Sequence, residues 1–205
     1  MPTSADAVFI NVPFDRRYKK LFDALVFAVH DCGFVARCAR EQDDGSQVRL
    51  DKLLEIIGTC RLSIHDLSRT SLDAKYRLPR FNMPLELGIF LGAKRYGGTR
   101  HAKKSCLILD RDQYRYQIFC SDIAGQDIRA HHDDAGLAIA AVRDWLRTNR
   151  PSSIGIPGAQ RMQDRYMQFR RELPAVARAA GLAVRELNFL DYRTLVTGWL
   201  DENSW

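Results

Sequence analysis

The sequence predicts an α/β fold: a flavodoxin- or Rossmann-like parallel sheet of about five strands, with helices on both faces and a C-terminal helical extension. Short apolar runs rich in β-branched residues alternate with longer segments in which apolar residues recur at helical spacing. That alternation is typical of a parallel sheet covered on both faces. The chain of 205 residues is long enough for one medium domain with a sizeable core.

The first three elements follow directly from hydrophobic patterning. The first strand is expected at residues 7–12, an apolar run bounded by Pro13. A helix is expected at residues 18–32, because apolar side chains recur there every three or four positions, and Gly33 ends it. The second strand is expected at residues 34–39.

The next elements repeat this order. A polar loop at residues 40–47 leads to a second amphipathic helix at residues 48–60 and to a third strand at residues 61–67. A second polar loop is expected at residues 68–81. It is followed by a helix at residues 82–96, which two consecutive glycines end.

A fourth strand is expected at residues 105–109, a fifth at residues 127–131 and a helix at residues 135–148. The stretch at residues 150–158 is rich in proline, glycine and serine, which predicts a linker. The chain therefore divides into an α/β domain at 1–150 and a helical extension at 151–205.

The extension is predicted to hold two helices. The first covers residues 159–180 and should be kinked or broken by Pro174. The second, shorter helix covers residues 191–200. Because this part is too small for a core of its own, we expect it to pack on the sheet domain or on a second subunit.

The composition is that of a globular protein, with 46% hydrophobic and 27% charged residues. No apolar run is long enough to span a bilayer, and the N-terminus lacks signal-peptide features, so we expect a cytoplasmic protein without membrane contact. The five cysteines form no Cys-x-x-Cys pair, which argues against a zinc site or disulfide scaffold. The net charge of +6 favours an anionic partner. Without a nucleic-acid motif, a phosphate-bearing small molecule is preferred to nucleic acid.

Candidate site residues leave the carboxyl ends of the predicted strands, because ligands bind there in open parallel sheets. The candidates follow the first strand, follow the third strand or lie around the start of the third helix. They are Pro13, Phe14, Asp15, Arg16, Arg17, Asp66, Ser68, Arg80, Asn82 and Glu86.

Glu86 is the strongest catalytic candidate, because it is a lone acid near the start of an otherwise apolar helix. Asn82 is a plausible N-cap, and the helix dipole favours the ionised carboxylate. Such a carboxylate can act as a nucleophile or stabilise a developing cation. The alternative is a solvent-exposed acid that only satisfies the dipole, but the apolar neighbours of Glu86 leave little solvated helix face.

The other candidates have structural alternatives of similar weight. Asp66 either takes part in catalysis or caps the following loop, and Asp15 either contacts substrate or caps the first helix. Arg16 and Arg17 oppose the dipole of that helix, which phosphate binding would explain. His65 lies in an apolar strand and is expected to be a buried, hydrogen-bonded histidine.

No metal site is expected. Adjacent residues in the stretch His131, His132 and Asp133 point apart on a strand, and no third ligand is evident. Aromatic residues at positions 114, 116 and 119 could wall a ring-shaped ligand, although core packing is the default.

In order and spacing, four motifs resemble the nucleoside 2-deoxyribosyltransferase-like group, which is related in fold to TIR-type NAD-cleaving domains. The motifs are a strand followed by Pro-Phe at residues 9–15, a strand ending in Asp at 62–68, Glu-Leu-Gly at 86–88 and Gly-Ala-Lys leading into a strand at 92–108. The resemblance covers about residues 7–110.

The resemblance implies that Glu86 attacks the anomeric carbon of a sugar and that Asp66 contacts the sugar or positions the leaving base. It also implies that the loop at Pro13 and Phe14 lines the substrate, and that a neighbouring subunit completes the site in a homo-oligomer. The chain departs from the group at residues 79–84, where Pro-Arg-Phe-Asn-Met-Pro replaces an Asp/Ser-Gly-Thr type approach to the glutamate.

The leading hypothesis is a hydrolase or transferase that cleaves the N-glycosidic bond of a nucleotide or an NAD-type molecule, which is a substrate and not a cofactor. One alternative is a non-catalytic nucleotide-binding or signalling module of the same fold. Another is an interaction protein whose C-terminal extension mediates assembly.

Overall fold

The computed structural model describes residues 6–41, 44–70, 72, 75, 77–150 and 155–204. Parts of three predicted loops and linkers lie outside the described residues, at positions 42–43, 71, 73–74, 76 and 151–154.

The five strands form one parallel sheet with the order β2-β1-β3-β4-β5, which confirms the predicted fold class. The strands are β1 (Ala7–Asn11), β2 (Val35–Arg37), β3 (Leu62–Asp66), β4 (Ser105–Asp110) and β5 (Ile128–Ala130). The second strand is three residues shorter than predicted, because only Val35 to Arg37 pair with β1. The chain order reverses between β1 and β3, where ligands bind in folds of this type.

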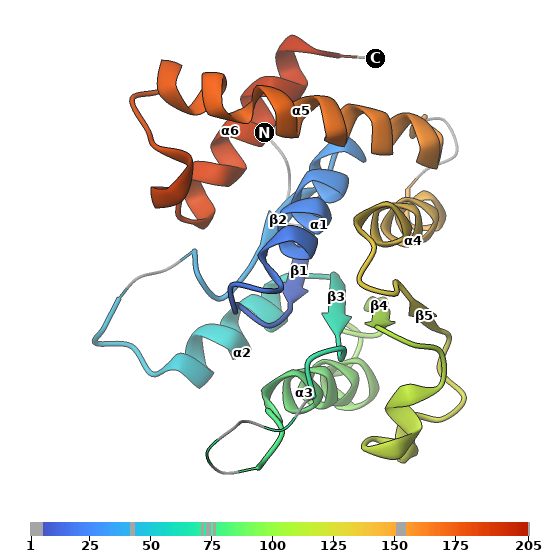
Figure 1. Cartoon of the computed structure of the whole chain (residues 1–205). Coiled ribbons are helices and arrows are strands. Elements are labelled where there is room, and N and C mark those ends of the chain that lie inside the picture. The colour runs from blue at the N-terminus through green and yellow to red at the C-terminus, as the bar shows by residue number, and fades with distance from the viewer. Residues whose placement is uncertain are drawn as a thin grey trace.

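The helices lie on both faces of the sheet (Figure 1). They are α1 (Lys19–Asp31), α2 (Arg49–Thr59), α3 (Asn82–Tyr96), α4 (Ala135–Thr148), α5 (Ala159–Ala179) and α6 (Phe189–Glu202). Helices α1 and α4 cover one face, and α2 and α3 cover the other. In the described part of the chain, no helix is both long and apolar enough to cross a bilayer.

The C-terminal helices differ from their prediction in two places. Helix α5 continues through Pro174, so the expected break is wrong. The proline removes one backbone hydrogen bond, but buried side chains on either side hold the helix against the core. Helix α6 begins two residues earlier than predicted, because Asn188 and Asp191 form a reciprocal capping box.

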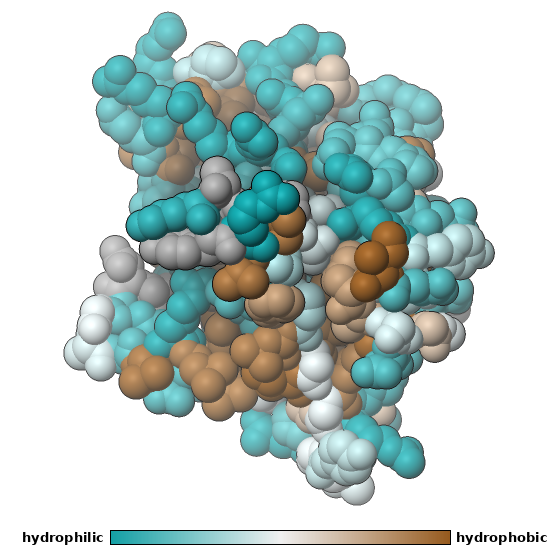
Figure 2. All heavy atoms as spheres, turned by 60° about the horizontal axis from the view of Figure 1, so that its bottom comes forward, coloured by the Kyte–Doolittle hydropathy of each residue, from teal (hydrophilic) through white to brown (hydrophobic). Residues whose placement is uncertain are grey.

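The carboxyl ends of all strands point to one edge of the molecule, downward in Figure 1. Figure 2 brings this edge forward and shows a band of hydrophobic side chains across it. Helices α2 and α3 begin at this edge, and their first turns carry exposed apolar side chains at Val48, Leu50, Phe81 and Leu85.

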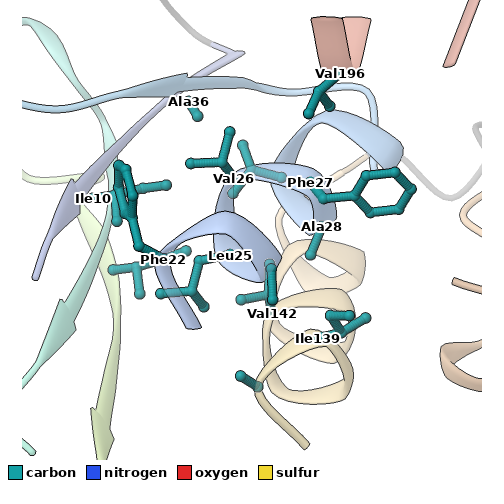
Figure 3. Close-up of a cluster of buried hydrophobic side chains, with 14 of the residues drawn as sticks. Ile10, Phe22, Leu25, Val26, Phe27, Ala28, Ala36, Ile139, Val142 and Val196 are labelled. Carbon is teal, nitrogen blue, oxygen red and sulfur yellow. The ribbon is translucent and has the colours of Figure 1, made fainter. Parts of the chain in front are cut away.

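Helix α1 is the centre of the main hydrophobic core. Its residues Leu25, Val26 and Phe27 are fully buried, with β1 and β2 on one side and α4 and α6 on the others (Figure 3). Ile10 of β1 and Val142 of α4 belong to the same buried cluster. A helix that is apolar on nearly all sides must be surrounded by protein, so α1 requires an outer layer.

Helices α5 and α6 supply that outer layer. The ring of Phe27 lies 5.3 Å from Tyr166, 5.5 Å from Phe169 and 6.0 Å from Trp199, measured between centroids. The hydroxyl of Tyr192 donates to the Asp23 carbonyl at 3.2 Å. The C-terminal extension and the sheet domain therefore share one core.

We predict that Phe27→Ala lowers the free energy of unfolding by about 3–5 kcal/mol, because it leaves a cavity between α1 and the C-terminal helices. Urea denaturation followed by circular dichroism measures this loss. Met167→Ala on the exposed side of α5 is the control and should change stability by less than about 0.5 kcal/mol. Equal effects of the two substitutions would contradict the shared core.

Candidate functional site

The carboxylate of Asp66, at the end of β3, is completely buried and hydrogen-bonded. The hydroxyl of Tyr18 donates to Oδ2 at 2.5 Å, and the backbone N–H of Ser68 donates to Oδ1 at 2.7 Å. Nε2 of His131 lies 3.0 Å from Oδ2. Burial opposes ionisation, but the donors on His131, Ser68 and Tyr18 outweigh it and hold the pKa of Asp66 below its usual value.

His131 reaches Asp66 from a strained loop between β5 and α4. The backbone N–H of Asp133 donates to Nδ1 of His131 at 3.0 Å, so Nδ1 carries a lone pair and Nε2 carries the proton that faces Asp66. His132 and Asp133 both have positive φ, at 50° and 57°. Two consecutive left-handed residues cost about 1–2 kcal/mol each, which the contacts of this loop must offset.

A second buried carboxylate, Asp110, ends β4 beside Asp66. Its Oδ1 accepts from Nε of Arg115 at 2.9 Å and from the backbone N–H of Arg111 at 2.7 Å. Arg115 also donates to the carbonyl of Leu67 and to the hydroxyl of Thr70. Burial raises the pKa of Asp110 despite these partners.

Several buried polar atoms at this edge lack a hydrogen-bond partner among the described residues. They are Asn11 Oδ1, Ser68 Oγ, Arg69 Nε and Asp110 Oδ2. Because buried polar groups are normally satisfied, such a cluster calls for an explanation, and a polar ligand is one.

Asn11 joins the sheet to α3. Its amide nitrogen donates to Nδ1 of His65 at 2.9 Å and to the carbonyl of Met83 at 3.2 Å, in the first turn of α3. Nε2 of His65 lies 2.8 Å from the hydroxyl of Ser63. Burial lowers the pKa of His65 to about 3, so the ring is neutral. The prediction of a buried, hydrogen-bonded histidine is confirmed.

Glu86 lies one turn beyond Met83 and is only 5% exposed. Burial raises its pKa to about 7, and the positive charge of Arg49 on α2 opposes this rise. Among the described residues, no hydrogen bond or ion pair reaches the Glu86 carboxylate. The expectation that Glu86 has little solvated surface is confirmed.

Glu86 differs in this respect from the other buried acids in the described chain. Asp66 has three close donors, Asp110 is paired with Arg115, and Asp31 lies 3.1 Å from a guanidinium nitrogen of Arg165. An acid with a raised pKa and no partner, at the ligand-binding edge of an α/β sheet, is a candidate for catalysis.

A cavity of about 280 Å³ opens on the other face of the sheet, beside α1. Four predicted site residues line it together with Arg40 and the start of α6; the four are Pro13, Phe14, Asp15 and Arg16. Neither Glu86 nor Asp66 contributes to its wall. The predicted residues therefore do not meet in one site: Glu86 lies on α3, on the other face of the sheet, whereas the side chain of Asp66 contacts Tyr18 beside α1.

The remaining predictions concern helix starts. Oδ1 of Asp15 accepts from the backbone N–H groups of Arg17 and Tyr18, both at 2.9 Å, so Asp15 caps the turn into α1 as one alternative predicted. The side chain of Arg17 is exposed and does not line the cavity. Arg80 and Asn82 are exposed. The predicted N-cap at Asn82 is wrong: Asn82 is the first helical residue and follows an uncapped Phe81.

Tyr18, Asp110 and the contact of His131 with Asp66 were not predicted from the sequence. The signal for Asp110 was present, because it ends an apolar strand just as Asp66 does. No pattern marked the hydroxyl of Tyr18, since its partner lies 48 positions away. Within the described residues, no three His, Cys, Asp or Glu side chains are arranged to hold a metal ion.

Comparison with known proteins gives no match to a protein-family model, to a curated protein or to a solved structure.

We predict that Tyr18→Phe lowers the free energy of unfolding by about 1–3 kcal/mol, because the buried Asp66 carboxylate loses a donor. Denaturant titration at neutral pH measures the loss. Tyr114→Phe removes an exposed hydroxyl and is the control, with an expected change within about 0.5 kcal/mol. A neutral Tyr18→Phe would show that this hydrogen bond contributes nothing to stability.

Proposed function

We propose that this protein cleaves the N-glycosidic bond of a nucleotide or an NAD-type molecule, as a hydrolase or a transferase, with Glu86 as the catalytic carboxylate. The observation that carries the proposal is the nearly buried, unpartnered Glu86 with its pKa raised to about 7. The similarity of the Glu-Leu-Gly motif to that of nucleoside 2-deoxyribosyltransferase-like proteins supports the same assignment.

In this mechanism the ionised Glu86 carboxylate attacks C1′ of the ribose, or stabilises an oxocarbenium-like transition state next to it. The bond between C1′ and the base nitrogen breaks, and the base leaves with the bonding electron pair. Water then attacks C1′, gives up a proton and restores the free carboxylate. A second base takes the place of water if the reaction is a transfer.

An NAD-type substrate fits the site better than a neutral nucleoside. Nicotinamide is cationic on the sugar and leaves without prior protonation, whereas adenine requires a general acid. Asp66 is unsuited to that task, because its lowered pKa keeps it ionised and its donors are fixed. We therefore assign Asp66 as a positioning residue, which holds the loops that carry Ser68 and His131.

The unpartnered acceptors at the carboxyl edge suit the sugar. The carbonyl oxygen of the Asn11 amide and the hydroxyl of Ser68 lack partners in the described structure, and ribose hydroxyls are donors and acceptors. Asn11 is linked to the first turn of α3, the helix that carries Glu86. Hydrogen bonds from these atoms would orient C1′ toward the carboxylate.

Glu86→Gln is expected to lower the rate of base release from NAD by at least about a hundredfold, because the amide can neither attack C1′ nor carry a negative charge. Chromatography of the free base measures the rate. Glu55→Gln, at an exposed glutamate of α2, is the matched control and should retain the wild-type rate.

Full activity of Glu86→Gln would exclude the mechanism. Saturable nucleotide binding without any product, from the wild type and a panel of nucleoside monophosphates, would favour the non-catalytic nucleotide-binding module instead.

The pH dependence of the reaction gives a second prediction. Because the nucleophile must be ionised and the pKa of Glu86 is about 7, the rate should fall as the pH drops below neutrality and level off above it. Arg49→Ala removes the charge that favours ionisation and should move the midpoint to higher pH. Initial rates between about pH 5 and pH 9 test this. A rate that rises toward acid would instead identify Glu86 as a proton donor.

A further inference from the structure

We propose that the cavity beside α1 is a second ligand site, which takes a nucleoside monophosphate. We call it the tail cavity and define it by two walls. One wall is formed by Arg40 and the segment between β1 and α1, and the other by Leu187 and the start of α6. This site goes beyond the proposed function, since Glu86 does not line it and ligand binding there does not require catalysis.

The size of the tail cavity restricts the ligand. Its volume of about 280 Å³ lies just below the range for drug-sized ligands, about 300–1,000 Å³. A single mononucleotide suits this volume better than a dinucleotide does. The cavity also lies between the segment that follows β1 and the start of α6.

Aromatic rings form the apolar wall. Phe14 and Phe22 meet edge to face with centroids 5.4 Å apart, and Phe22 lies 5.9 Å from Phe189. Tyr192 completes this wall, with its hydroxyl fixed on the carbonyl of Asp23. Rings held by their neighbours offer a rigid surface for a planar base, at low cost in conformational entropy.

Three cations also line the cavity: Arg16, Lys19 and Arg40. The guanidinium of Arg40 lies 4.6 Å from the centroid of Phe14 and donates to the Phe14 carbonyl at 3.0 Å, which holds it in place. Lys19 is neutralised by Asp23 at 2.8 Å. Arg16 is exposed and takes part in no ion pair among the described residues. Arg16 and Arg40 are thus available to a phosphate, which guanidinium groups bind in bidentate geometry.

Two polar side chains in the lining of the tail cavity suit a ribose. Asp15 uses Oδ1 for its cap, which leaves Oδ2 without a hydrogen bond in the described structure. Asn188 uses its amide oxygen to cap α6, which leaves its amide nitrogen as a donor. The cavity therefore has aromatic rings for the base, polar side chains for the sugar and arginines for the phosphate.

The proposal is tested by calorimetric titration of the full-length Glu86→Gln variant with AMP, adenosine and inorganic phosphate. We expect AMP to bind in the tail cavity more tightly than either fragment does, and the substitutions in the cavity identify this binding event. In this background, Arg16→Glu should weaken AMP binding at least about tenfold, because it replaces a phosphate-binding cation with an anion. Leu187→Trp should abolish the binding event of the tail cavity by filling it.

Arg17→Glu is the matched control, since the neighbouring arginine is equally exposed but does not line the cavity. It should leave AMP affinity unchanged, and circular dichroism verifies that each variant is folded. Absence of AMP binding, equal losses from both charge reversals, or binding that Leu187→Trp leaves intact would each overturn the proposal. Base release from NAD by the wild type is a separate measurement, so failure of this site and failure of the proposed activity are distinguishable.

Discussion

The carboxyl edge of the sheet depends on the buried charge of Asp66. An unpaired carboxylate at this depth would cost several kcal/mol, so its donors stabilise the folded chain. Those donors come from three separate segments: the start of α1 with Tyr18, the loop after β3 with Ser68 and the loop after β5 with His131. One charge thereby fixes three loops relative to one another. The left-handed backbone at His132 is tolerated in this setting because the same network holds it.

A second constraint is the all-round apolar surface of α1. The sheet and α4 cover only part of this helix, and the aromatic side chains of α5 and α6 cover the rest. The C-terminal helices are therefore needed to complete the core. They also create the tail cavity, since Phe189 and Tyr192 lie opposite Phe14 only while α6 stays docked on α1.

The alternation of strands and helices could be predicted from the sequence. Both faces of the sheet are buried, so each strand appears as a short apolar run between helices with apolar residues at helical spacing. Glu86 could be singled out for the same reason, as a lone acid among apolar neighbours. The partners of Asp66 could not be predicted, because Tyr18 and His131 lie far from it in sequence and meet it only once the sheet has formed. The continuity of α5 through Pro174 was likewise decided by tertiary packing that overrides local preference.

The unpartnered state of Glu86 has a consequence for ligand choice. Because the pKa of Glu86 is about 7, a bound ligand can change its protonation state, whereas the donors around Asp66 keep that carboxylate ionised. A cationic ring beside Glu86 favours the ionised carboxylate and lowers its pKa, and by linkage the ionised carboxylate favours the cation. A neutral base gains nothing from this coupling. Under the proposed function, a buried carboxylate that forms no ion pair in the described structure favours a ligand that brings a cation, which is the electrostatic reason to propose a pyridinium leaving group over a purine.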